Sequence, residues 1–198
     1  PYPRRIVCLT AETTEIAFAL GAGDRVVGVS GYSVRPPEAR RKPKVAAYTS
    51  ARLDKILELR PDVILAFSDL QADLVRDLVK AGLTVLVTNQ RSLSDTWDAI
   101  RLIGRVLGAP TEAEKLAADL QDEVERFRQD AARLPRCPRV FFEEWDDPLI
   151  SGIRWVAELI EAAGGEDIFP ELRSAHRAPD RVVDPAEVVR RDPEVIVA

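Results

Sequence analysis

TEAEKLAADLQDEVERFRQDAARLP, residues 111–135, decides how the chain is organised. Thr111 is a suitable N-cap residue, acidic side chains follow at Glu112 and Glu114, and neither Gly nor Pro interrupts the run before Pro135. The run therefore predicts one long helix of roughly 24 residues, about 36 Å at 1.5 Å per residue, which is enough to cross a small domain.

Upstream of this helix, short apolar runs alternate with helical stretches. The apolar runs cover residues 6–9, 26–29, 63–67 and 85–87, and helices are expected near 13–20, 52–59, 71–81 and 94–107. Continuous β-branched runs are typical of parallel strands that helices cover on both faces. Residues 1–110 therefore predict an N-terminal α/β lobe.

Downstream of the helix the same alternation starts again. A strand is expected at 139–142, helices at 153–163 and 184–191, and a last strand at 195–197. Residues 185–198 also repeat the order of residues 53–66, in which a short helix, a Pro and an apolar strand follow one another.

The resulting fold class is α/β, with two Rossmann-like lobes joined by one long helix. We expect an N-terminal lobe at 1–110, a linking helix at 111–135 and a C-terminal lobe at 136–198. Because the sequence stops on a strand, the second lobe is expected to be incomplete, truncated at its carboxyl end.

Charge and hydropathy exclude two classes of partner. The formal net charge of −5 argues against nucleic acid, which needs a concentrated basic field. The basic cluster from Arg35 to Lys44 lies in a Pro-rich stretch and is interpreted as a solvated loop. No apolar stretch approaches the roughly 20 residues of a membrane span, so no membrane insertion is expected.

The metal-ligating residues are too few for a metal centre. His176 is the single histidine, and the two cysteines, Cys8 and Cys137, are far apart in the sequence. We expect no metal site, and we expect both cysteines to be buried free thiols rather than a disulfide. No nucleophile motif such as Gly-x-Ser-x-Gly occurs, so no catalytic residue is assigned.

Polar and aromatic residues gather just beyond the expected strands, where open α/β sheets bind ligands. Rigid rings with a few polar neighbours suit a large, partly apolar ligand. The candidate ligand-binding residues are Thr10, Ala11, Glu12, Tyr32, Tyr48, Ser68 and Asp69 in the first lobe, and Trp145, Ser151, Gly152, Arg154 and Trp155 in the second.

Several motifs together resemble the ABC-transporter substrate-binding proteins with a helical backbone, the family that captures vitamin B12, ferric siderophores or haem. The resemblance rests on the opening Arg5-Ile6-Val7 and on residues 13–21, 26–30, 36–37, 53–66 and 162–165, and it spans essentially the whole chain. Within the family, the vitamin B12 binders are the most similar, with a tyrosine placed as Tyr32 is.

The resemblance implies a binding protein and not an enzyme. It implies that cobalamin (vitamin B12) or a related corrinoid is captured in a cleft between the lobes by a monomer, for uptake through an ABC permease outside the cytoplasm. It further implies docking on the permease through one acidic residue per lobe. Asp54 holds that position in the first lobe, whereas the same register in the second falls on Ala186, with Glu187 one residue further on.

Other functions stay open at this stage. A ferric-siderophore or haem carrier could use Arg154 beside Trp155 against an anionic ligand. A soluble cobalamin-binding protein without a permease, acting in the cytoplasm, would fit the lack of a visible signal segment. An enzyme on a nitrogenase-component-like scaffold would need a ligand set that the sequence does not contain, and an interaction module would need an exposed apolar patch.

Overall fold

The computed structural model describes residues 2–198, which form two units. Unit 1 comprises residues 2–90 and 97–117, and unit 2 comprises residues 91–96 and 118–198. The boundaries expected at 110 and 136 differ from this division, which assigns residues 91–96 to unit 2 and falls again between residues 117 and 118. Within residues 2–198, no helix is long and apolar enough to cross a membrane.

Unit 1 is built on a five-stranded, all-parallel sheet with the strand order β3-β2-β1-β4-β5. The expected parallel α/β lobe is thus confirmed, with one strand more than the sequence predicted, because β3 lies in the Pro-rich stretch interpreted as a loop. The strands are β1 (Ile6–Cys8), β2 (Val26–Ser30), β3 (Lys44–Ala46), β4 (Val63–Phe67) and β5 (Val85–Thr88).

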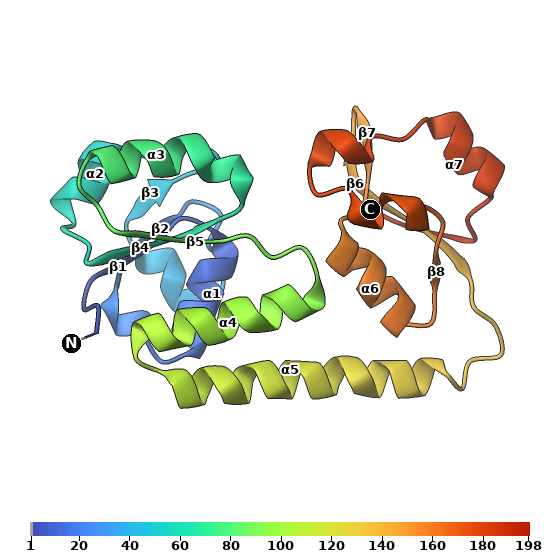
Figure 1. The fold of residues 1–198 in the computed structure, drawn as a ribbon, viewed down its shortest axis with the longest axis horizontal. Coiled ribbons are helices and arrows are strands. Elements are labelled where there is room, and N and C mark those ends of the chain that lie inside the picture. The colour runs from blue at the N-terminus through green and yellow to red at the C-terminus, as the bar shows by residue number, and fades with distance from the viewer. Residues whose placement is uncertain (1) are drawn as a thin grey trace. The chain divides into compact units, whose positions relative to one another are not determined.

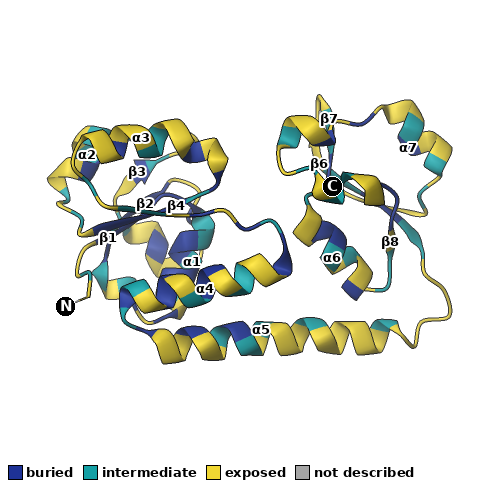
Figure 2. Cartoon of the chain, viewed as in Figure 1, coloured by how far each residue is buried: buried dark blue, intermediate teal, exposed yellow. Residues whose placement is uncertain are grey.

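Helices cover both faces of this sheet (Figure 1). Two of them, α2 (Leu53–Glu58) and α3 (Ala72–Lys80), lie on one face, where Ile56 and Leu78 pack with buried residues of the strands. Helices α1 (Ala11–Ala19) and α4 (Leu93–Leu107) lie on the other face. The core strands are buried from both sides, as their continuous apolar sequence predicts (Figure 2).

The long helix α5 runs from Pro110 to Ala131. It begins one residue before Thr111, so Thr111 lies inside the helix, and Pro110 fits its first turn because proline has no N–H to leave unpaired. It ends four residues before Pro135, in a tight turn in which Leu134 donates its N–H to the Ala131 carbonyl. The division between the two units falls inside this helix: its residues up to 117 belong to unit 1 and those from 118 belong to unit 2.

Unit 2 has a smaller, mixed sheet around β6 (Arg139–Asp146). Strand β7 (Leu149–Ser151) pairs with β6 antiparallel, whereas β8 (Glu166–Asp167) and β9 (Val195–Val197) pair with it in parallel. Phe141 and Phe169 form the centre of the core, with ring centroids 5.9 Å apart in an edge-to-face arrangement. The helices are α6 (Arg154–Ala162) and α7 (Pro185–Arg191).

Short 3-10 helices complete both units. They are η1 (Gly23–Arg25), η2 (Pro37–Arg41), η3 (Asp69–Gln71), η4 (Pro170–Ser174) and η5 (Ala178–Arg181).

The two copies of the internal repeat also share an unusual backbone conformation. The residue before each repeated proline is Arg60 in unit 1 and Asp192 in unit 2, with φ values of 45° and 47°. Non-glycine residues adopt this left-handed conformation rarely. Two matching exceptions at equivalent positions support the predicted relation between the helix-Pro-strand segments.

The two cysteines are free but differ in exposure. Cys8 is fully buried in β1, whereas Cys137 is exposed, so the expectation of a buried thiol was wrong at position 137. Residues 132–138 form a turn after α5 rather than part of a strand, which explains the exposure of Cys137.

We therefore predict that a thiol reagent such as Ellman's reagent titrates one cysteine in the native protein at pH 8. Burial raises the pKa of the Cys8 thiol to about 12, so almost no thiolate is present there. Cys8 should react only after the protein unfolds. Equal reaction of both thiols in the folded protein would contradict this burial.

Candidate functional site

All seven first-lobe candidates follow strands at the carboxyl edge of the unit 1 sheet. Because all five strands are parallel, the segments that follow them leave the sheet at the same edge. Thr10, Ala11 and Glu12 follow β1, Tyr32 follows β2, Tyr48 follows β3, and Ser68 and Asp69 follow β4. We call this set of segments the carboxyl edge of unit 1.

The candidates on this edge differ in what they offer to a ligand. Tyr32 and Tyr48 are 64% and 42% exposed, so their rings are available for contact. Thr10 and Ser68 are buried and support the backbone, because Thr10 caps α1 and Ser68 accepts a hydrogen bond from the Leu70 N–H. These two residues therefore shape the edge rather than present a free hydroxyl.

A polar side-chain pair crosses the same edge. Gln90, two residues after β5, donates a hydrogen bond from its Nε2 to a carboxylate oxygen of Glu12 at the start of α1. β4 lies between β1 and β5 in the sheet, so the pair spans the carboxyl end of β4. Desolvation raises the pKa of Glu12, and the hydrogen bond from Gln90 opposes that rise.

The raised pKa of Glu12 predicts a pH-dependent effect of Glu12→Gln on stability. A carboxyl whose pKa is higher in the folded state costs stability when charged, and the cost is absent below the unfolded pKa. This cost develops as the pH rises from the unfolded-state pKa to the folded-state pKa of Glu12. Glu12→Gln should thus raise the melting temperature at pH 8, with a gain that shrinks toward zero at pH 4.5; a constant gain would contradict the shift.

In unit 2, Trp145 lies on a strand and not in a loop after one. From the sequence, the strand was expected to end at Phe142, before the charged Glu143 and Glu144. In the structure, β6 continues to Asp146, because its last residues pair with β7. The Trp145 ring is 60% exposed and its Nε1 donates to the Asp147 carbonyl at 3.0 Å. Trp145 is thus an exposed residue of a β-hairpin.

The start of α6 carries the remaining candidates. Arg154 forms an ion pair with Glu158 at 2.8 Å, and Trp155 is 38% exposed. Glu158 also accepts a hydrogen bond from the Leu93 N–H, and Trp155 donates its backbone N–H to the Arg91 carbonyl. Helix α6 therefore holds the segment 91–96, and Arg154 takes part in that attachment.

Ser151 and Gly152 lie between the hairpin and α6. Ser151 is 2% exposed, and its carbonyl accepts a hydrogen bond from the guanidinium of Arg181. The same guanidinium forms a two-pronged ion pair with the Glu144 carboxylate on β6. Arg181 is itself 2% exposed, so this buried cation fixes the hairpin that carries Trp145.

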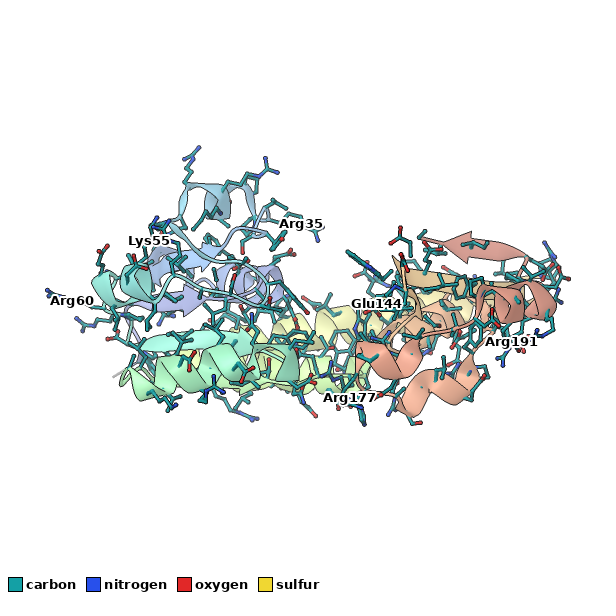
Figure 3. All side chains as sticks on the ribbon, turned by 90° about the horizontal axis from the view of Figure 1, so that it is seen from above. Arg35, Lys55, Arg60, Glu144, Arg177 and Arg191 are labelled. Atoms are coloured by element: carbon teal, nitrogen blue, oxygen red, sulfur yellow. The ribbon has the colours of Figure 1, made fainter. Side chains whose placement is uncertain are left out.

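Glu144 and Arg191, both labelled in Figure 3, belong to separate ion-pair groups of unit 2. In the second, Arg191 on α7 pairs with Glu171 at 2.6 Å and with Glu187 at 2.7 Å. Arg190 pairs with Glu187 as well. These arginines lower the pKa of the Glu187 carboxyl and largely neutralise its charge.

The two acidic residues expected to dock on a permease are therefore in unlike surroundings. Asp54 lies exposed in the first turn of α2. Glu187 is half-buried and paired with two arginines of its own helix. Docking through Glu187 would have to replace these ion pairs.

The sequence missed three residues of the two sites. Gln90 could have been found, because the rule applied to the other strand ends also marks the polar Asn89-Gln90 after β5. Arg181 and Glu158 gave no signal, since their roles depend on contacts with Glu144 and Leu93 far away in the sequence. In residues 2–198, no group of three or more His, Cys, Asp or Glu residues could hold a metal ion.

Comparison with known proteins assigns the family. Residues 6–198 match the family described as periplasmic binding protein, and the chain belongs to that family. It is a solute-binding protein and not an enzyme.

The relatives of known name include vitamin B12-binding proteins. That of Pectobacterium carotovorum is 30% identical, over 98% of this chain and 71% of its own length. That of Vibrio vulnificus is 32% identical, over 83% of this chain and 61% of its own length. The chain therefore spans between three fifths and three quarters of these two relatives.

Solved structures of the same fold include binders of two kinds of ligand. The periplasmic vitamin B12 binding protein of Vibrio cholerae superposes with a TM-score of 0.80 at 29% identity, over 99% of this chain and 76% of the other. A periplasmic heme-binding protein of Roseiflexus sp. RS-1 gives a TM-score of 0.82 at 28% identity, over 98% and 75%. These similarities confirm the expected fold class.

Proposed function

We propose that this protein binds cobalamin or a related corrinoid and delivers it to an ABC permease outside the cytoplasm. The carboxyl edge of unit 1 carries the proposal, because it presents the exposed Tyr32 and Tyr48 on the same sheet edge as a part-buried polar pair. Broad rings with few polar groups suit a corrin, which is large and only partly apolar. The vitamin B12-binding relatives support the same ligand.

Unit 2 contributes a second aromatic surface to the proposed ligand contacts. Trp145 on the hairpin and Trp155 at the start of α6 are both accessible. The buried Arg181 and the Glu158 contacts hold these two positions before any ligand arrives. Preorganised contacts of this kind lower the entropy cost of binding.

A haem or ferric-siderophore ligand is the second candidate, because the Roseiflexus heme-binding protein has the same fold. The unit 2 surface gives it less support. Siderophore and haem ligands carry anionic groups, and Arg154, the cation expected to meet them, is paired with Glu158. The acidic Glu12 on the carboxyl edge also opposes an anionic ligand.

Delivery to a permease is proposed to use the exposed Asp54 on α2. Its position at a helix start leaves the carboxylate accessible to a permease arginine. Glu187 stays a proposed second contact, with the cost of replacing its two arginine partners.

Competition dialysis tests the choice of ligand. Radiolabelled cyanocobalamin is equilibrated with the protein, and an excess of haem or of a ferric siderophore is added in parallel samples. We expect unlabelled cyanocobalamin to displace the label and the other two to leave it bound. Displacement of the label by haem, at a concentration equal to or lower than that of unlabelled cyanocobalamin, would favour haem as the ligand.

A further inference from the structure

We propose that the oxygens of Glu12 and Gln90 form a subsite of hydrogen-bond acceptors that selects ligand side chains ending in amides over those ending in carboxylates. This inference rests on the proposed corrinoid function and specifies which ligand side chains the carboxyl edge of unit 1 recognises. Corrinoids with amide side chains fit it, whereas ligands with carboxylate side chains do not.

The orientation of Gln90 follows from the charge of its partner. Its Nε2 donates to Glu12, because the opposite orientation would place two oxygens against each other. Gln90 is 5% exposed, and among residues 2–198 its Oε1 has no hydrogen-bond partner. A buried acceptor without a partner costs free energy until a donor reaches it.

A second unpaired oxygen lies two residues before Gln90 in the sequence. Thr88, the last residue of β5, is 6% exposed, and its Oγ1 also lacks a partner within the described residues. Glu12 remains part-exposed, so its carboxylate has room for a further donor besides Gln90. The end of β5 and the start of α1 therefore offer oxygens that can accept from N–H or O–H groups, although the Thr88 hydroxyl can also donate.

Charge adds selectivity to this hydrogen-bonding pattern. The carboxylate of Glu12 attracts amide N–H groups and repels ligand carboxylates, and partial burial strengthens both effects. Glu15, on the same helix, pairs with Arg35 at 3.3 Å and does not share this environment. A ligand carboxylate placed at Glu12 would leave both acceptors unsatisfied.

Two corrinoids with one macrocycle test the proposal. Dicyanocobinamide carries amide side chains, and dicyanocobyrinic acid carries carboxylates in their place. Dissociation constants for both are measured at pH 8 by absorbance titration with the wild type, Glu12→Gln, Glu12→Ala and the control Glu15→Gln. Melting curves confirm that each variant is folded.

We expect the wild type to prefer the amide ligand by about tenfold or more, which corresponds to about 1.4 kcal/mol. Glu12→Gln and Glu12→Ala should reduce this preference about fivefold, chiefly by tightening the carboxylate ligand, because the repulsion is lost. Glu15→Gln should leave the preference within about twofold, since exposed charges are screened.

Failure of the inference and failure of the function give different results. An unchanged preference in both Glu12 variants, or a reduction caused only by weaker amide binding, would overturn the selectivity of Glu12 while leaving corrinoid binding intact. If neither corrinoid binds to the wild type, the proposed function itself fails, and the selectivity fails with it.

Discussion

Replacing Arg181 by Met should lower the free energy of unfolding by about 2–4 kcal/mol, since it removes one partner of a buried ion pair. Arg181 is 2% exposed and binds both the Glu144 carboxylate and the Ser151 carbonyl. Its loss also removes this hydrogen bond from the Ser151 carbonyl. The Glu144 side chain is 36% exposed, so water partly compensates for its lost partner, and the effect stays below that of a fully buried pair.

Chemical denaturation followed by tryptophan fluorescence measures this loss, because Trp145 and Trp155 report on unit 2. The control is Arg177→Met, four residues away on the exposed surface (Figure 3), which should leave the transition midpoint almost unchanged. Glu144→Met in the Arg181→Met background should recover part of the stability, because an apolar pair replaces the ion pair. An Arg181→Met midpoint equal to that of Arg177→Met would contradict the buried role.

Tyr32→Ala and Trp145→Ala should each weaken cyanocobalamin binding about tenfold to a hundredfold, and the double variant should weaken it further. Burying a ring that is free in the unliganded protein contributes about 1.5–3 kcal/mol. Tyr32 and Trp145 are 64% and 60% exposed, so most of each ring is available for such burial. Calorimetric titration of the three variants measures the change.

Tyr2→Ala is the matched control for these variants. Tyr2 is 62% exposed, much as Tyr32 is, but it precedes β1 and its ring lies close to Gly108. It is therefore at the amino end of the strand and away from the carboxyl edge. Equal losses of affinity in Tyr2→Ala and Tyr32→Ala would show that the carboxyl edge is not the ligand surface.

The sequence predicted those parts of the fold that local pattern controls. The apolar strands of unit 1 and the uninterrupted helix before Pro135 were found, because side-chain periodicity and helix breakers act over a few residues. β3 was missed because only Val45 in it is buried, among basic neighbours. The end of β6 was missed because its outer half depends on pairing with β7 and not on its own hydrophobicity.

Site prediction was limited by long-range contacts. The strand-end rule placed Glu12 and Tyr32 on one edge, since parallel strands bring their carboxyl ends together. The rule could not show that Ser151 is buried, that Arg154 is paired with Glu158, or that Gln90 reaches Glu12. Each of these depends on partners distant in the sequence or on burial that three-dimensional packing creates.

Calorimetric titration of the wild-type protein with cyanocobalamin tests corrinoid binding most directly. We predict saturable binding of one molecule per chain, with a negative heat-capacity change because apolar rings are buried. The absence of saturable heat over the accessible concentration range, with the protein shown to be folded by its melting curve, would contradict the proposed function.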